Sequence, residues 1–139
     1  MIPRDLQLLH FAGVDRATST MLGAMTVELG KDPVDIGGII DIGRRGQRFG
    51  TELLRTVRVI AHRHYGIPRL IAGCEASNDA GRAWLTRSGL TRTHGPDTHT
   101  LPNGRRIQAT WWESTDPYAT IACRSRSRRR RDHLPPVGL

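Results

Sequence analysis

A basic loop between residues 43 and 50 is the part of the sequence best suited to bind a ligand. It carries Arg44, Arg45 and Arg48 among glycines, after an apolar run and before a helical pattern of apolar residues. The first amides of a helix are unpaired and lie at the positive end of its dipole, and glycine lets a phosphate approach the main chain. This arrangement predicts an anion site. A basic turn that only caps the helix is the alternative.

Two familiar phosphate-binding motifs do not fit the loop. No Gly-Lys-Ser or Gly-Lys-Thr stands where a nucleotide P-loop needs it. The three glycines of the dinucleotide-binding fingerprint are also absent at their required spacing. A phosphate held by this loop therefore belongs to a different kind of site.

The loop is predicted to connect a strand at residues 34–42 with an amphipathic helix that begins at Thr51 and ends near Gly66. The apolar residues at helical spacing are Leu53, Leu54, Val57, Ile60 and Ala61. A second apolar run at residues 69–76 predicts a buried strand. Because a helix joins the two strands, we expect them to pair in parallel through a right-handed crossover.

Other short apolar runs predict the rest of the sheet. Residues 6–14 and 21–29 flank a cluster of turn formers, and with residues 34–42 they predict a three-stranded antiparallel meander. Gly37 and Gly38 weaken the third strand and indicate a bulge.

A second helix and a hairpin are predicted towards the end. Asn78 lies in a Ser-Asn-Asp cap, and the helix closes at residues 88–89. The pair Asn103-Gly104 between residues 98–100 and 107–112 is a strong hairpin signal. The predicted fold class is α/β (α+β), with a mixed, mostly antiparallel sheet.

The bulk composition sets further limits. A chain of 139 residues fits one domain, which we place at residues 1–117. Its net charge of +8 comes largely from six arginines at residues 124–131, in a tail at residues 118–139 that we expect to be disordered. No apolar run is long enough for a membrane span, so a cytoplasmic protein without membrane contact is expected. Cys74 and Cys123 have neither zinc nor disulfide spacing, and no metal is expected.

Residues 35–54 resemble the fourth strand, pyrophosphate loop and third helix of the Gcn5-related N-acetyltransferase (GNAT) family. The family loop reads Arg/Gln-x-x-Gly-x-Gly/Ala. Arg45 and Gly50 match its first and last positions, whereas Arg48 stands at the usual central glycine. Residues 78–90 resemble the family's Asn-x-x-Ser…Gly-Phe helix.

The resemblance covers roughly residues 8–113. The hairpin at residues 101–106 is typical of the subgroup that acetylates protein N-termini, including those of ribosomal proteins. Family members have a strand and two helices before the first hairpin, and this chain begins almost at that hairpin. The resemblance therefore implies a shortened form, or a substrate wall supplied by another subunit. An uncovered edge or apolar face also favours a homodimer.

The resemblance implies an enzyme that transfers an acetyl group from acetyl-CoA to a primary amine by direct attack. The acceptor would be a protein N-terminus or a small-molecule amine. The strand main chain would pair with the pantetheine arm, the loop amides would hold the pyrophosphate, and an asparagine would close the site. The implied coenzyme-binding residues are Ile40, Asp41, Ile42, Arg45, Gly46, Gln47, Arg48, Phe49, Gly50, Thr51 and Asn78.

The general base is sought among carboxylates near the separating strands. Glu75 is the first choice and Asp35 the second, and Asp41 and Glu28 are further candidates; each of them has a solvated or cap-forming carboxylate as its alternative reading. The hydroxyl groups usual in the family are missing, because Leu85 and Gly81 stand at the tyrosine and serine positions. His94 and His99 are expected to be surface residues beside the hairpin.

Two other hypotheses accompany the enzyme. One is a catalytically weak or inactive remnant that keeps coenzyme binding. The other is a basic RNA- or ribosome-binding module that acts through the arginine-rich tail, whose polyanion affinity would fall steeply with salt. No aromatic residues are interleaved in the arginine run to stack on bases, which favours the enzyme.

Overall fold

The computed structural model describes residues 7–41, 43, 46, 48–101 and 103–116. Seven strands form one sheet in the order β1-β2-β3-β4-β7-β5, and β6 pairs with β7. The elements are β1 Leu8–Val14, β2 Met21–Glu28, β3 Val34–Ile40, α1 Phe49–Val59, the π-helix η3 Ile60–His64, β4 Arg69–Glu75, α2 Asp79–Arg87, β5 Thr91–Thr93, β6 Thr98–Thr100 and β7 Arg106–Thr115.

The first three strands form the expected antiparallel meander. The register of β2 with β3 runs without interruption from Gly23↔Ile40 to Glu28↔Asp35, so the bulge expected at Gly37 and Gly38 is wrong. The irregularity lies in β1, between Gly13 and Val14. Gly38 instead permits close strand packing, since a Cβ there would lie 2.2 Å from Met25 Sδ.

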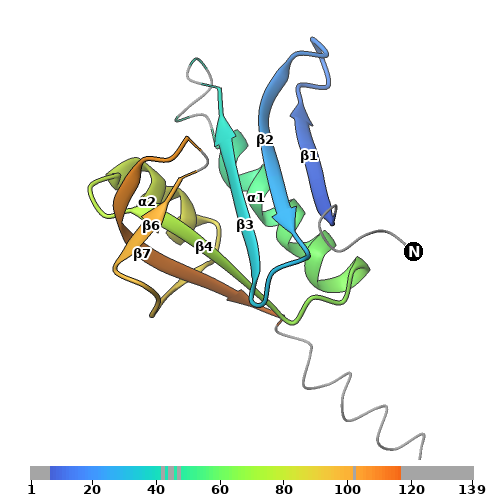
Figure 1. Ribbon diagram of the computed structural model, residues 1–139. Helices are drawn as coiled ribbons and strands as arrows, with labels where there is room; N and C mark the ends of the chain where they lie inside the picture. Colours follow the sequence, from blue (N-terminus) through green and yellow to red (C-terminus); the bar gives the residue numbers. More distant parts are fainter. Residues whose placement is uncertain (1–6, 42, 44–45, 47, 102, 117–139) are drawn as a thin grey trace, which may run out of the picture.

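β3 and β4 pair in parallel, as expected, but only briefly. Their pairing consists of Val34↔Leu70 and Asp35↔Ile71. The strands then separate, and Figure 1 shows the widening gap between them. On its other edge β4 pairs with β7 along its whole length, from Arg69 to Glu75. The sheet is therefore divided near its middle.

Both described helices cover the same face of the sheet (Figure 1). The apolar face of α1 buries Leu54 and Val57, and α2 buries Leu85. Together with strand residues such as Ile36 and Leu70 they form the core. Each fully buried side chain of this size contributes about 1.5–3 kcal/mol, so the core fixes how the helices lie on the sheet.

Several elements differ from expectation. The first helix begins at Phe49 rather than Thr51, and it widens into the π-helical turn η3 before Tyr65. β5 was not expected, because three polar residues carry no strand pattern.

The hairpin around Asn103-Gly104 is confirmed, with Gly104 at a φ of 84°. Neither described helix is long and apolar enough to cross a lipid bilayer.

Some predictions fall outside the described residues. They include disorder of the tail at residues 118–139 and RNA binding through its arginines. Three of the predicted coenzyme-binding residues, Ile42, Arg45 and Gln47, also lie outside the described residues. Homodimerisation stays a prediction.

Candidate functional site

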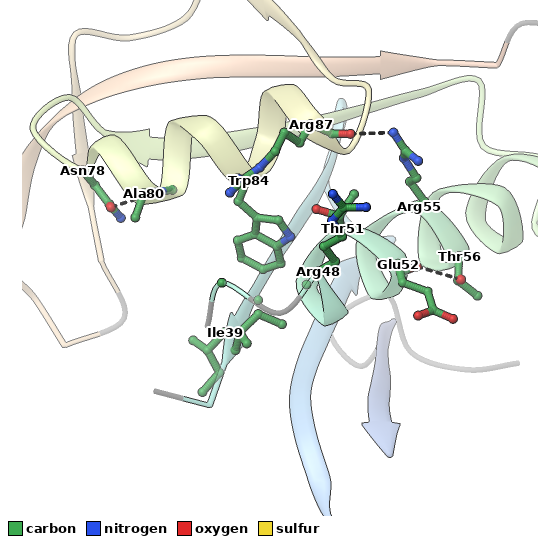
Figure 2. Close-up of a pocket in the computed structure, with 15 residues that line it drawn as sticks. Ile39, Arg48, Thr51, Glu52, Arg55, Thr56, Asn78, Ala80, Trp84 and Arg87 are labelled. Atoms are coloured by element: carbon green, nitrogen blue, oxygen red, sulfur yellow. Dashed lines mark hydrogen bonds between the residues drawn. The ribbon is translucent and has the colours of Figure 1, made fainter. Parts of the chain in front are cut away.

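A groove of about 870 Å³ lies where the end of β3, the start of α1 and one side of α2 meet (Figure 2). The predicted ligand-binding residues that line it are Ile40, Gly46, Arg48, Gly50, Thr51 and Asn78. Asp41 and Phe49 are described but do not line it. The structure therefore brings together residues from the basic loop and from the distant cap of α2.

The start of α1 has an unusual cap. Arg48 occupies the N-cap position in the left-handed region, with φ 67° and ψ 0°, and gives the helix no side-chain hydrogen bond. Glycine adopts this conformation without strain, whereas a residue with a Cβ does so at a cost. The arginine thus keeps the backbone shape suited to glycine. Since no described side chain caps the helix, its first amides are open to an external acceptor.

Gly50 lies at the point where all three elements touch. A Cβ at this position would lie 3.0 Å from Ile40 Cγ1 and 3.1 Å from Trp84 Nε1. Figure 2 shows Trp84 projecting from α2 towards the start of α1. Within the described residues, Trp84 Nε1 is buried and has no hydrogen-bond partner. The groove therefore has a closely packed floor at Gly50.

Asn78 caps α2 at the other side of the groove. Its Oδ1 accepts a hydrogen bond of 2.9 Å from the Gly81 amide. A Cβ on Gly81 would lie 2.7 Å from Asn78 Nδ2 and 2.9 Å from Cys74 Sγ. The packing explains why glycine replaces the hydroxyl residue usual at this point in the resembled helix. Burial raises the pKa of the Cys74 thiol, so this residue is a poor nucleophile.

The two carboxylates predicted as catalytic lie on the helix-free face of the sheet. Glu75 Oε2 accepts a hydrogen bond from Arg105 Nη2 at 2.7 Å and does not line the groove. Asp35 lies in a second cavity of about 460 Å³. Since Asp35 is paired with Ile71, the two carboxylates are roughly 13 Å apart along the strands.

The second cavity surrounds Asp35 with basic and aromatic groups. Residues that line it include Lys31, Asp35, Arg69, His94, His99 and Trp111. Lys31 Nζ lies 3.9 Å from Asp35 Oδ2. Burial raises the pKa of the Asp35 carboxyl, and Lys31 partly opposes that effect. His94 is exposed, as expected, whereas His99 is half-buried and packs edge-on against Trp111 at 5.3 Å.

Several lining residues were not expected from the sequence, among them Arg55, Trp84 and Arg87. Arg55 follows Thr51 by one helical turn, and this spacing was a usable signal. Trp84 and Arg87 become visible only when α2 is placed against α1. No group of three His, Cys, Asp or Glu residues in the described part of the chain is arranged to hold a metal ion.

Residues 3–91 match the family model described as an acetyltransferase (GNAT) domain. The chain belongs to the GNAT family. No curated protein sequence matches it.

Solved structures share the GNAT fold at low sequence identity. A Vibrio cholerae protein assigned as a ribosomal-protein-serine acetyltransferase has a TM-score of 0.72 at 18% identity, over 81% of this chain and 66% of its own. A ribosomal-protein-S5-alanine acetyltransferase from Vibrio fischeri has a TM-score of 0.69 at 13% sequence identity. The match covers 79% of this chain and 62% of that protein. A dodecameric spermidine N-acetyltransferase from Vibrio cholerae has a TM-score of 0.68 at 14% sequence identity. The match covers 82% of this chain and 68% of that protein. The chain thus spans less than two thirds of the length of the first two.

Proposed function

We propose that this GNAT domain binds acetyl-CoA in the groove and transfers the acetyl group to a primary amine by direct attack. The observation that carries the proposal is the separation of β3 from β4 next to an uncapped, basic helix start. A groove of this kind suits a ligand with an anionic head and a long amide-bearing arm. Acetyl-CoA has that shape, and its thioester supplies the activated acetyl group.

The groove residues divide by chemistry along its length. At the start of α1, Arg48 and the amides near Gly50 and Thr51 would hold the pyrophosphate. The end of β3 would lie beside the pantetheine arm as a neighbouring strand does, in the manner of β-augmentation. Asn78 would close the opposite side. The anion-binding end and the strand end are thus continuous, as one extended ligand requires.

Asp35 is the better candidate for general base, although Glu75 was the first choice from the sequence. An arm that enters at α1 and runs along β3 reaches the point where the strands close, at Asp35 and Ile71. Glu75 lies at the open end and is held by Arg105 at 2.7 Å, a closer pair than Lys31 and Asp35 at 3.9 Å. The raised pKa of Asp35 strengthens it as a proton acceptor. The amine nitrogen would attack the thioester carbon, its proton would pass to Asp35, and the thiolate would leave.

The acceptor is proposed as a peptide N-terminus or a small polyamine. Two of the similar structures carry names with ribosomal-protein acceptors, and one is named for spermidine. The second cavity offers Asp35 and the neighbouring Asp32, which suit an amine that arrives protonated. Its volume of about 460 Å³ suits a small amine or the first residues of a peptide.

Calorimetric titration with acetyl-CoA tests the binding step. Ala80 is exposed and lines the groove, and Ala83 is exposed on the same helix outside it. We expect Ala80→Trp to abolish binding and Ala83→Trp to preserve it, with circular dichroism verifying both folds. A folded wild-type chain without saturable binding contradicts the proposal.

Acetyl transfer to peptide and polyamine acceptors tests the second step. Loss of a general base costs about 10²–10⁴-fold in rate, so Asp35→Asn should lose that much activity while still binding acetyl-CoA. Glu75→Gln should stay within a few-fold of wild type. The reverse order would return the base assignment to Glu75.

A further inference from the structure

Lys31 is the only lysine in the 139-residue chain, and it lies in the wall of the second cavity. It stands in the turn between β2 and β3, beside the start of β4 (Figure 1). Asp35, the proposed general base, lines the same cavity. The other basic side chains counted with Lys31 are arginines, which stay protonated and offer no amine for acylation. The acceptor cavity thus contains a primary amine that belongs to the protein itself.

Two carboxylates hold the Lys31 side chain at the cavity. Its Nζ lies 3.1 Å from Glu28 Oε2 and 3.9 Å from Asp35 Oδ2. The register of β2 with β3 sets Glu28 opposite Asp35, so both carboxylates approach Lys31 from one face of the sheet. The Lys31 side chain is 53% exposed. Although 3.9 Å exceeds a hydrogen bond, a rotamer change of this flexible stem brings the amine within reach of the base.

The acetyl group would arrive at the same place. Under the proposed function, the pantetheine arm runs along β3 towards Asp35 and its partner Ile71. Lys31 precedes Asp35 by four residues, and its amine already lies beside that carboxylate. An amine fixed near a base and a thioester reacts without the entropy cost of bringing in a free acceptor. The site therefore favours transfer to Lys31 when no other acceptor is bound.

We propose that Lys31 is a modification site, which the domain acetylates on its own Nζ in an intramolecular reaction. This inference rests on the proposed function, since it uses the same coenzyme groove and the same base. Asp35 takes one proton from the Lys31 ammonium, and the neutral nitrogen attacks the thioester carbon. The C–N bond forms, the C–S bond breaks, and the nitrogen releases its second proton to water. The thiolate takes the proton held by Asp35, which leaves Nε-acetyl-lysine and coenzyme A.

Acetylation would change the charge of the acceptor cavity. An acetylated lysine carries no positive charge, so Glu28 and Asp35 would lose the cation that they share. Both carboxylates would then be available to a protonated acceptor. The modification would thus alter the site at which later acceptors bind.

Mass spectrometry of the full chain after incubation with acetyl-CoA tests the proposal. We expect one acetyl group on Lys31, located by peptide mapping, at a rate per molecule that does not change with protein concentration. Asp35→Asn should slow this labelling by about 10²–10⁴-fold, the loss expected for a general base. The matched control is Arg16→Lys, which places a second lysine in the exposed β1–β2 turn, outside the cavity. The introduced lysine should be acetylated at least about 100-fold more slowly than Lys31.

Each other outcome overturns the modification site. Equal labelling of Lys31 and the introduced lysine would show spontaneous acetylation in solution. Undiminished labelling in a folded Asp35→Asn chain would separate Lys31 from the base. A rate per molecule that rises with protein concentration would make the transfer intermolecular. If Lys31 stays unlabelled while an added peptide or polyamine is acetylated, only this inference fails. If no amine is acetylated, the proposed transfer fails together with it.

Discussion

Gly50 and Trp84 touch across the junction of α1 and α2, with 3.1 Å between Trp84 Nε1 and the place where a Cβ on Gly50 would lie. That separation is closer than a side-chain carbon normally comes to such an atom. Packing therefore favours glycine at this position of the loop. Any larger residue must push the indole or Ile40 away.

Gly50→Val should destabilise the domain, because its side chain has no room beside Trp84 and Ile40. Overpacking of this kind costs about 1–3 kcal/mol in the free energy of unfolding, measured by urea titration. Gly37→Val is the matched control, since a Cβ there meets nothing within 4 Å. It should change stability by about 0.5 kcal/mol or less. Equal losses in both variants would show that the contact is unimportant.

Arg48→Gly should stabilise the fold although it deletes a large side chain. At φ 67° the arginine Cβ is strained, and relief of that strain exceeds the extra chain entropy of glycine by about 0.5–1 kcal/mol. Arg48→Ala loses the same charge but keeps the Cβ, so it should show no gain. Thermal unfolding of the three proteins measures the difference. A glycine variant no more stable than the alanine variant would contradict the strain.

Asp35 should make stability depend on pH in acid solution. Its pKa in the folded state lies above the ordinary 3.8, so the folded chain binds the proton more tightly than the unfolded chain. Unfolding free energy should therefore fall as pH rises from 3.8 through the folded-state pKa. Asp35→Asn lacks this loss, and its advantage over wild type should grow across that interval and then level off. If the stability curves of wild type and Asp35→Asn against pH ran parallel, the raised pKa of Asp35 would be refuted. Asp32→Asn is the control, because it removes a neighbouring carboxylate.

Ser114→Ala should break a buried chain of hydrogen bonds. Arg58 Nε donates to Ser114 Oγ at 2.7 Å, and Ser114 Oγ lies 2.7 Å from His62 Nε2. His62 Nδ1 lies 2.7 Å from the Ile67 carbonyl, which can only accept, so Nε2 takes the Ser114 hydrogen in the neutral ring. Alanine leaves the buried His62 Nε2 and the half-buried Arg58 Nε without this partner.

The expected cost of Ser114→Ala is about 2–4 kcal/mol by urea unfolding, at about 1–3 kcal/mol for each unsatisfied group. Thr115→Ala, on the exposed next residue, should cost about 0.5 kcal/mol or less. A loss for Ser114→Ala as small as the control would mean that water replaces the hydroxyl.

Much of the fold could be predicted because its signals are local. Alternating apolar residues, the turn at residues 15–20 and the Asn103-Gly104 pair each act within a few residues. The meaning of Gly37 and Gly38 could not be read in this way, because it depends on how closely Met25 packs from the next strand. The π-turn of η3 and the short β5 likewise depend on tertiary packing.

The candidate site follows the same division. Its strand, loop and helix start form one continuous stretch, so Ile40, Arg48 and Gly50 could be named from the sequence. Trp84 enters only because α2 lies against α1. The choice between Asp35 and Glu75 depends on where β3 leaves β4, and no pattern within either strand marks that point.

The early separation of β3 from β4 also affects the mechanics of the domain. Two ladder pairs join the meander to the rest of the sheet, so the seam between two half-sheets runs through the middle. An arm bound along β3 would close this seam as a missing strand does, and would tie both halves to one ligand. Binding would then stiffen strands far from the groove, as far as β1 at the outer edge. Under the proposed function, ligand binding would thus complete the sheet as well as fill the groove.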